Sequence, residues 1–363
     1  MLPAQCGRCC GVCTCHHKDL AQHRTTLDVD FGGTVYSGRS NRILITGITG
    51  FVGSHMAELA IQSGMSVFGS IRPRSNMDNI KHLTDSVSLI YADLRDASAA
   101  RNLLDKAEPE YIVHLAAHSF VGTSWGSPSE TLDNNLSCQI NLFEALRSTF
   151  RNSPGMAPRF LVIGSSEEYG MVLPDELPIK EDQPLRPLSP YAVSKVGQDM
   201  MGYQYWQSYS LPIVRTRAFN HEGPRRGSAF VTSNFAQQIA RIEANKQHPV
   251  IHVGDLSTRR DYTDVRDIVH GYMLLLQRGQ SGEVYNLCSG NDWQIQVVLN
   301  YLLSLSKDRD RIAVEVDKKR LRPSDVPVLV GDNSKIKSQL GWKPEIPFTQ
   351  TLQDTLTYWR QRV

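Results

Sequence analysis

Two short stretches of the sequence carry residue types that could perform hydride and proton chemistry. Residues 165–170 (SSEEYG) hold a hydroxyl and carboxylates, and Tyr191 and Lys195 stand in the spacing Tyr-x-x-x-Lys. Residues four apart on a helix share a face, so we expect Lys195 to lie beneath Tyr191. A nearby lysine cation favours the phenolate and lowers the tyrosine pKa. The pattern therefore predicts that Tyr191 acts as an acid and a base near neutral pH.

The elements that would position these residues begin at Asn41. Residues 42–46 (RILIT) form a short apolar run typical of a buried strand, glycines follow, and a helical pattern extends over residues 54–64. A strand, a glycine turn and a helix start bind phosphates in dinucleotide folds, because glycine lets the backbone approach and the helix N-terminus offers free N–H groups. A glycine turn without a ligand is the alternative. The cofactor contacts predicted here are Gly47, Thr49, Gly50, Phe51, Val52 and Gly53.

The residue after the second strand indicates which dinucleotide is bound. A NAD-binding fold usually places an acid there, on the ribose 2′-hydroxyl. Here residues 66–71 (SVFGSI) are followed by Arg72 and no carboxylate, which favours NADP(H) over NAD. A solvated loop arginine is the alternative. Further predicted cofactor contacts, at the ends of strands over residues 87–91 and 111–117, are Asp93, Leu94, Leu115, Ala116 and Ala117.

Strands and helices continue to alternate through the first half of the chain. A helical pattern over residues 132–148 precedes a strand at 159–164, which delivers Ser165. This alternation predicts an α/β fold with a doubly wound parallel (Rossmann) sheet. Ligands bind at the C-terminal ends of the strands in such sheets, and residues 165–167 lie at one of those ends.

Composition and charge exclude several classes of protein. The chain has 363 residues, of which 40% are hydrophobic, and a net charge of +2. This length predicts one large domain or two intimately joined domains. The charge gives no reason to expect nucleic acid or an anionic membrane as a partner. No apolar run reaches the ~18 residues of a membrane helix, and no apolar signal-peptide core stands near the start, so we expect a cytoplasmic protein.

Five of the seven cysteines stand near the start of the chain, at positions 6, 9, 10, 13 and 15. Their Cys-x-x-Cys spacings could hold zinc, but no second ligand pair follows at finger-like distance and apolar periodicity is absent. We therefore set residues 1–40 aside as a Cys-rich, disordered extension and predict no metal site. Cys138 and Cys288 are expected to be isolated buried thiols, which suits a reducing compartment.

Several motifs resemble one superfamily. The glycines at 47, 50 and 53, residues 114–117 (HLAA), Ser165 and the Tyr191–Lys195 pair resemble the extended short-chain dehydrogenase/reductase superfamily. Within it, further blocks resemble the branch of GDP-mannose 4,6-dehydratase and GDP-4-keto-6-deoxymannose reductase. They are residues 165–170 (SSEEYG), 219–227 (FNHEGPRRG), 260–262 (RDY), 321–326 (LRPSDV) and 341–344 (GWKP). The resemblance covers about residues 41–360.

The C-terminal third is expected to form a smaller, interleaved substrate domain. The cofactor domain would span residues 41–218 with a returning segment at about 250–290, and the substrate domain residues 219–249 and 291–363. Guanidinium forks suit phosphate oxygens, so arginines here are candidates for a sugar-nucleotide diphosphate, although a loop salt bridge is equally compatible with Arg226. The predicted substrate contacts are Ser119, Ser166, Glu167, Asn220, Arg226, Arg260, Arg322 and Asp325.

The resemblance implies a nucleotide-sugar 4,6-dehydratase that converts GDP-mannose to GDP-4-keto-6-deoxymannose and recycles its NADP internally. Tyr191 would take the proton of the sugar 4-hydroxyl, with Ser165 sharing that hydrogen bond and Lys195 supporting it, while C4 passes hydride to NADP⁺. Glu167 would then remove the C5 proton as water leaves C6, and hydride would return to C6. We expect His114 to be a hydrogen-bonded core residue, and we assign no catalytic role to it or to His118.

The nearest alternative is the NADPH-dependent GDP-4-keto-6-deoxymannose reductase, which needs Ser165, Tyr191 and Lys195 but not Glu167. Ser165 stands where the dehydratases usually carry threonine, and residues 264–267 (DVRD) and 284–287 (VYNL) look more like the reductase. Another NAD(P)-dependent nucleotide-sugar epimerase or decarboxylase is a further alternative. A non-catalytic dinucleotide sensor of the same fold is a distant one.

The helix that carries Tyr191 also predicts a homo-oligomer. It continues through residues 200–206 (MMGYQYW), which carry more apolar surface than one helix face needs. In the superfamily that this chain resembles, the corresponding helix pairs with a partner's in a four-helix bundle, which implies a dimer or tetramer. Packing of these side chains under the C-terminal domain is the alternative.

Overall fold

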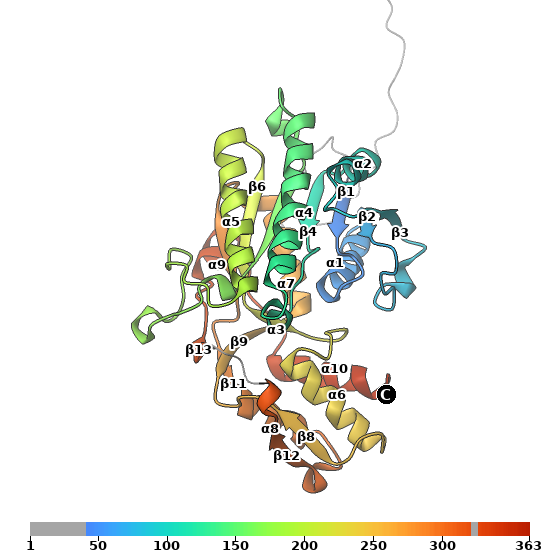
Figure 1. The fold of residues 1–363 in the computed structure, drawn as a ribbon, viewed down its shortest axis with the longest axis vertical. Coiled ribbons are helices and arrows are strands. Elements are labelled where there is room, and N and C mark those ends of the chain that lie inside the picture. Colours follow the sequence, from blue (N-terminus) through green and yellow to red (C-terminus); the bar gives the residue numbers. More distant parts are fainter. Residues whose placement is uncertain (1–40, 321–325) are drawn as a thin grey trace, which may run out of the picture. The chain divides into compact units, whose positions relative to one another are not determined.

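The computed structural model describes residues 41–320 and 326–363 (Figure 1). The predictions for the Cys-rich segment 1–40 and for Arg322 and Asp325 lie outside the described residues. Within the described residues, no helix is both long and apolar enough to cross a membrane. Cys138 and Cys288 are buried free thiols, as predicted.

A parallel sheet organises the larger part of the described chain. It has seven strands there, in the order β10-β6-β5-β4-β1-β2-β3, and every pairing between them is parallel. The order reverses between β1 and β4, which opens a crevice at the C-terminal ends of the strands. The topology confirms the predicted doubly wound α/β fold. The strands are β1 (Arg42–Thr46), β2 (Ser66–Ile71), β3 (Val87–Tyr91), β4 (Tyr111–His114), β5 (Arg159–Ser165), β6 (Ile213–Ala218) and β10 (Val284–Leu287).

Helices bury both faces of this sheet (Figure 1). Ile45 packs in a core with α1, α7 and α9, whereas its neighbour Leu44 packs in a second core with α2, α4 and α5. Successive side chains of a strand point to opposite faces, so one strand serves both cores. The helices are α1 (Phe51–Gln62), α2 (Ala97–Ala107), α3 (Val121–Ser124), α4 (Pro128–Thr149), α5 (Pro190–Tyr209), α7 (Val265–Arg278) and α9 (Ser334–Leu340).

Local sequence fixes where α5 begins. Ser189 accepts a hydrogen bond from Ala192 N (3.1 Å), and Pro190 occupies the first turn, where a missing N–H costs nothing. Helix α5 then lies against β5 and β6 and alongside α4. Its first two turns therefore stand next to the C-terminal end of β5, where Ser165 ends the strand.

The smaller part of the described chain is built around β9. In that part, β7, β11 and β13 pair with β9, β8 pairs with β12, and α6, α8 and α10 enclose a core that includes Phe235, Leu299 and Leu352. The strands are β7 (Asn220–Glu222), β8 (Val250–Val253), β9 (Arg259–Asp264), β11 (Asp292–Gln294), β12 (Ala313–Val316) and β13 (Val328–Leu329). The helices are α6 (Val231–Glu243), α8 (Ile295–Ser304) and α10 (Phe348–Arg360).

The chain returns to the large sheet at α7 and β10. Within the segment at about 250–290, expected to belong to the cofactor domain, β8 pairs with β12 and β9 belongs to the smaller part, whereas β10 joins the large sheet. The burial of the strands agrees with this division. All four residues of β10 are buried, as a parallel sheet covered on both faces requires, whereas His252 in β8 is exposed. The boundaries of the two domains remain a proposal.

Candidate active site

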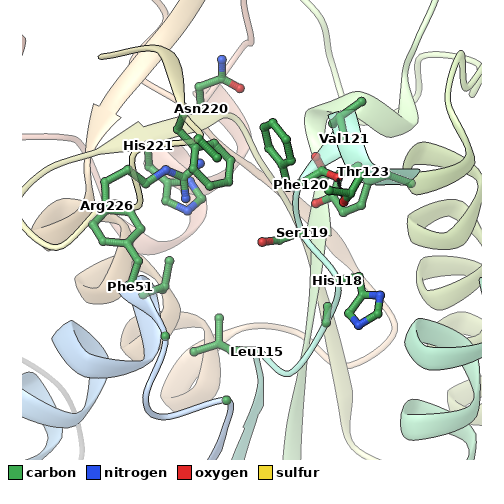
Figure 2. Close-up of a pocket in the computed structure, with 18 of the residues that line it drawn as sticks. Phe51, Leu115, His118, Ser119, Phe120, Val121, Thr123, Asn220, His221 and Arg226 are labelled. Atoms are coloured by element: carbon green, nitrogen blue, oxygen red, sulfur yellow. Dashed lines mark hydrogen bonds between the residues drawn. The ribbon is translucent and has the colours of Figure 1, made fainter. Parts of the chain in front are cut away.

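A cavity of about 1160 Å³ lies along the C-terminal ends of the parallel strands. Its walls come from the turn between β1 and α1, the ends of β2 to β6, the start of α5, and parts of β7, α6 and β9. Figure 2 shows Phe51 and Arg226 on one side of the open space and Ser119 and Phe120 on the other. The cavity thus joins the cofactor side of the chain to its predicted substrate side.

The turn between β1 and α1 folds tightly on itself and against the residues that follow β4, because glycines occupy its crowded positions. Gly47 has a φ of +70°, and a Cβ there would stand 2.9 Å from Ala116 N. A Cβ on Gly53 would stand 2.3 Å from Gly47 O. The predicted contacts Gly47, Thr49, Gly50, Phe51, Val52 and Gly53 all line the cavity. This cradle, with the free N–H groups of the α1 N-terminus, fits the pyrophosphate of a dinucleotide.

The other predicted cofactor residues also line the cavity. Arg72 follows β2 at the cavity wall, and Ser75 Oγ accepts a hydrogen bond from Arg72 N (3.0 Å), which shapes the turn. Arg95 donates two side-chain hydrogen bonds to Asp93, at 3.0 and 2.6 Å, and these lower the pKa of Asp93 to about 2. The remaining contacts are Leu94, Leu115, Ala116 and Ala117. The last three follow the end of β4 at His114, so the strand is shorter than predicted.

Ser165 and Tyr191 meet at the end of β5. Both line the cavity, and their hydroxyl groups share a hydrogen bond. The predicted fall in the Tyr191 pKa is wrong in this structure, because burial raises that pKa and the bond with Ser165 opposes the rise only in part. Lys195 lies on the same helix face, as predicted, but its Nζ donates to Ile163 O and Gln198 Oε1, both at 2.9 Å. Burial lowers the pKa of Lys195 to about 8.

Residues 166–168 form a single 3₁₀ turn directly after β5. Ser165 and Glu167 both line the cavity, whereas Glu168 is buried and its Oε1 accepts a hydrogen bond from Ser165 N (2.7 Å). The expected grouping of Ser165 with Glu167 therefore holds, although the turn, and not an extended chain, produces it. The predicted contact of Ser166 with the substrate is wrong. Its hydroxyl is buried, lacks a hydrogen-bond partner among the described residues, and lies outside the residues that line the cavity.

The opposite wall carries the predicted substrate contacts. Ser119, Asn220, Arg226 and Arg260 all line the cavity. The Arg226 guanidinium carbon lies 3.4 Å from the centre of the Phe230 ring and 5.0 Å from that of Phe51. Burial lowers the pKa of Arg226, and Glu222 lies 3.8 Å from its Nε. An arginine held between aromatic rings in a cavity wall suits an anionic ligand.

Sequence reasoning missed several residues that line the cavity. They are His118, Phe120, His221, Glu222, Phe230, Asn234, Tyr262 and Tyr272. Glu222 had a signal in the sequence, because it stands two residues after Asn220 on the short strand β7 and shares its side of the strand. Tyr272 had none, since it lies on a buried face of α7. His114 is the hydrogen-bonded core residue that was predicted: Nδ1 lies 2.8 Å from Thr46 Oγ1, and burial lowers its pKa to about 3.

Comparison with known proteins identifies the family. The family model described as GDP-mannose 4,6 dehydratase matches residues 44–355. The chain belongs to the GDP-mannose 4,6-dehydratase family. This result confirms the branch that the motifs of residues 165–170 and 219–227 resemble.

The similar proteins are described by two different activities. The chain is 34% identical over 320 residues to GDP-mannose 4,6 dehydratase 2 of Arabidopsis thaliana, covering 85% of this chain and 84% of that protein. It is 30% identical over 324 residues to GDP-6-deoxy-D-mannose reductase of Pseudomonas aeruginosa, covering 89% of this chain and 99% of that protein. The structure of RMD from Pseudomonas aeruginosa complexed with NADPH superimposes with a TM-score of 0.74 at 29% identity, over 89% of this chain and 100% of that one.

Proposed function

We propose that this protein is an NADP-dependent GDP-mannose 4,6-dehydratase, a lyase that forms GDP-4-keto-6-deoxymannose. The observation that carries the proposal is the position of Glu167. Glu167 lines the same cavity as Ser165 and Tyr191, at the end of β5. Proton abstraction at C5 needs a carboxylate there, whereas hydride transfer to or from C4 alone does not.

Each catalytic residue of the cavity has a separate role in this reaction. Bound NADP⁺ supplies the hydride acceptor at C4 and the later hydride donor at C6. Tyr191 takes the proton of the sugar 4-hydroxyl. Ser165, which already forms a hydrogen bond with Tyr191, also binds this sugar hydroxyl. Glu167 removes the C5 proton, which the adjacent 4-ketone acidifies, and passes it to the departing C6 hydroxyl, so that water leaves. When hydride reaches C6, the proton that Tyr191 took from the 4-hydroxyl is returned to the sugar at C5. Lys195 keeps a positive charge near Tyr191 when it is protonated, below its pKa of about 8.

The substrate wall supports a nucleotide-diphosphate sugar. Arg226 and Arg260 line the cavity and provide guanidinium groups for phosphate oxygens, and Ser119 and Asn220 provide hydrogen-bonding groups for a sugar. The dehydratases and the reductase named above are described by their GDP-sugars, which supports GDP as the nucleotide. Arg72 at the end of β2 supports NADP over NAD, and the NADPH in the Pseudomonas structure agrees with it.

The reductase is the second candidate, because the Pseudomonas reductase matches this chain over 99% of its own length. One incubation separates the two functions. Purified protein with GDP-mannose, catalytic NADP⁺ and no added reductant should yield a 4-keto-6-deoxy sugar nucleotide, detected by mass spectrometry. Turnover only with NADPH and the 4-keto sugar would instead establish the reductase.

We also propose a cytoplasmic homo-oligomer. Buried free thiols at Cys138 and Cys288 suit a reducing compartment. On α5, Val193, Met200 and Tyr203 are each more than 40% exposed, although Tyr205 is buried. Helices α4 and α5 lie side by side, and the exposed apolar side chains of α5 offer a surface to a second copy.

A further inference from the structure

A buried carboxyl group stands directly behind the catalytic hydroxyl. The Glu168 side chain is 0% exposed, and its Oε1 accepts a hydrogen bond from Ser165 N at 2.7 Å. Ser165 in turn accepts from Glu167 N with its hydroxyl (3.2 Å), so Glu168 and Ser165 close the two ends of the 3₁₀ turn. The reaction assigned above makes no use of Glu168.

A series of side-chain contacts leads from Glu168 to the helix that carries Tyr191 and Lys195. Arg217 Nε on β6 lies 3.2 Å from Glu168 Oε2, an oxygen that accepts no hydrogen bond from the described residues, and burial first, with Asp199 second, raises the pKa of Glu168. Arg217 also donates two hydrogen bonds to Asp199 Oδ2, from Nε at 2.9 Å and from Nη2 at 2.6 Å. Asp199 is 0% exposed and stands on α5 one turn after Lys195. These side-chain contacts therefore connect the end of β5 to α5 through the core of the protein.

Further hydrogen bonds hold these side chains in one arrangement. Arg215 Nη1 donates to the other Asp199 oxygen (2.7 Å) and its Nη2 to Gly282 O (2.8 Å). Arg217 Nη1 donates to Tyr169 OH and to Glu181 O. Two carboxyl groups thus face two guanidinium groups, and both arginines are fixed by neutral acceptors as well. Buried charges that lose a partner are costly, so this arrangement resists partial rearrangement.

Gly164 shows that the backbone is built to admit the Glu168 side chain. A Cβ at this position would stand 2.4 Å from Glu168 Oε1 and 2.2 Å from Thr216 O. Any other residue would force the carboxyl group or strand β6 to move. The glycine before Ser165 therefore lets the acid fold back under the strand end.

We propose that Glu168 is a positioning residue that couples Ser165 to α5, so that the Ser165 hydroxyl and the Tyr191–Lys195 pair are held in one geometry. The proposal rests on the proposed function only in that Ser165 and Tyr191 are the groups that react. Displacements of about 1 Å at reacting groups can cost on the order of 100-fold in rate, so a rigid link between β5 and α5 has a direct effect on turnover. The link acts through the Ser165 backbone N–H at one end and through Asp199 at the other.

The first arm of the test is a double-mutant cycle on turnover. Glu168→Leu keeps the size but removes the acceptor of Ser165 N–H, and we expect kcat to fall roughly 10- to 100-fold while the Kd for NADP(H) changes less than about twofold. Glu168→Gln keeps an amide oxygen for that N–H and should recover most of the loss. Asp199→Asn should lower kcat as well, and the pair E168L/D199N should lose less than the product of the two single losses, because both act on one link.

Asp267→Asn is the matched control. Asp267 is also buried and accepts two backbone N–H bonds, from Glu345 at 3.1 Å and Ile346 at 2.9 Å, but lies outside the cavity lining. D267N should lower the melting temperature, leave kcat near that of the parent protein, and combine with E168L multiplicatively. If E168L keeps the parent kcat at a temperature where it is folded, if E168Q is no better than E168L, or if the E168L and D199N losses multiply, the proposal is wrong.

The second arm needs no substrate, so it separates failure of this inference from failure of the proposed function. Amide hydrogen exchange is followed in peptides covering residues 159–169 and 190–199 of the full chain. Asp199→Asn should accelerate exchange in the first peptide and E168L in the second, although each substitution lies on the other element. D267N should change neither peptide. Exchange that changes only around the substituted residue would overturn the proposal, whether or not GDP-mannose is a substrate.

Discussion

The Nζ atom of Lys195 lies 5.9 Å from the centre of the Tyr191 ring and donates its hydrogen bonds to Ile163 O and Gln198 Oε1. The ammonium group is thus held by β5 and α5 beside the Tyr191 ring. Burial works against both groups, since it raises the pKa of Tyr191 and lowers that of Lys195. We therefore expect proton transfer at Tyr191 to depend on keeping Lys195 charged.

Lys195→Met should lower kcat by about 10²–10⁴-fold, because the positive charge that favours the Tyr191 phenolate is lost. Steady-state kinetics with GDP-mannose measure this directly. Lys335→Met is the control, since Lys335 also donates to a backbone carbonyl, Val284 O at 2.7 Å, but lies outside the cavity lining. Equal activity of the two variants would contradict the assigned role of Lys195.

Arg72→Ala should weaken NADP(H) binding by roughly 10- to 100-fold and leave NAD(H) binding unchanged. A charge-assisted hydrogen bond to a phosphate contributes about 1.5–3 kcal/mol, and only NADP(H) carries the 2′-phosphate. Dissociation constants for both cofactors are measured by fluorescence titration. Arg74→Ala, two residues further along and outside the cavity lining, should behave like the parent protein. Tighter binding of NAD(H) than NADP(H) by the parent would refute the cofactor assignment.

Glu167→Gln should still oxidise C4 but should stall before water loss. Reduced cofactor would then accumulate and absorb in the near ultraviolet, while turnover falls by about 10²–10⁴-fold for loss of a general base. Rapid mixing with GDP-mannose followed by absorbance shows the stall. Since Glu168 is buried behind Ser165 and lies outside the cavity lining, Glu168→Gln should not produce it. Unchanged turnover in E167Q, or the same stall in E168Q, would assign the base elsewhere.

Stability should fall as the pH falls from 6.5 towards 4. Burial first, and Arg225 second, lower the pKa of His55 to about 4, while Glu58 faces the same ring and opposes the shift. The unfolded chain then binds more protons between pH 4 and 6.5, so the free energy of unfolding decreases on acidification. His55 alone should account for about 2 kcal/mol between pH 7 and pH 5.

Urea denaturation at pH 7 and pH 5 measures this dependence. His55→Gln should reduce the change in unfolding free energy between pH 7 and pH 5 by about 2 kcal/mol. His270→Gln, at an exposed position, serves as the control. Buried His114 and half-buried His221, whose pKa values desolvation lowers to about 3 and about 4, should supply part of the remainder. A pH dependence identical in H55Q and the parent protein would show that His55 does not contribute.

A charged residue on the outer face of α5 should dissociate the proposed oligomer. Met200 and Tyr203 are 42% and 44% exposed, and a carboxylate at either position would lose its hydration in an apolar interface. Light scattering at micromolar concentration should give a dimer or tetramer for the parent protein and a monomer for Met200→Glu. Gln207→Glu, at an exposed polar position of the same helix, is the control. A monomeric parent protein would end the proposal.

The sequence predicted that Ser165 and Glu167 would line the cavity, but not the backbone conformation that places them there. Ser165 and Glu167 line the cavity together, as the motif suggested, but a 3₁₀ turn places them there. Ser166 belongs to the same motif and lies outside the cavity lining, because the turn directs it into the core. Three consecutive residues can be located by a motif, but their side-chain directions depend on how the strand ends.

Short-range patterns determined the fold class, the glycine cradle and the helix with Tyr191 and Lys195, because each is encoded by neighbouring residues: an apolar strand, glycines at fixed offsets, and two residues one turn apart. Only the tertiary structure decided which strands join the large sheet and what surrounds each charge. Val250–Val253 pairs with β12 and leaves His252 exposed, and Lys195 Nζ donates to Ile163 O because β5 lies against α5. Burial and pKa depend on residues distant in sequence, so local patterns could not supply the Tyr191 pKa or the link from Glu168 to Asp199.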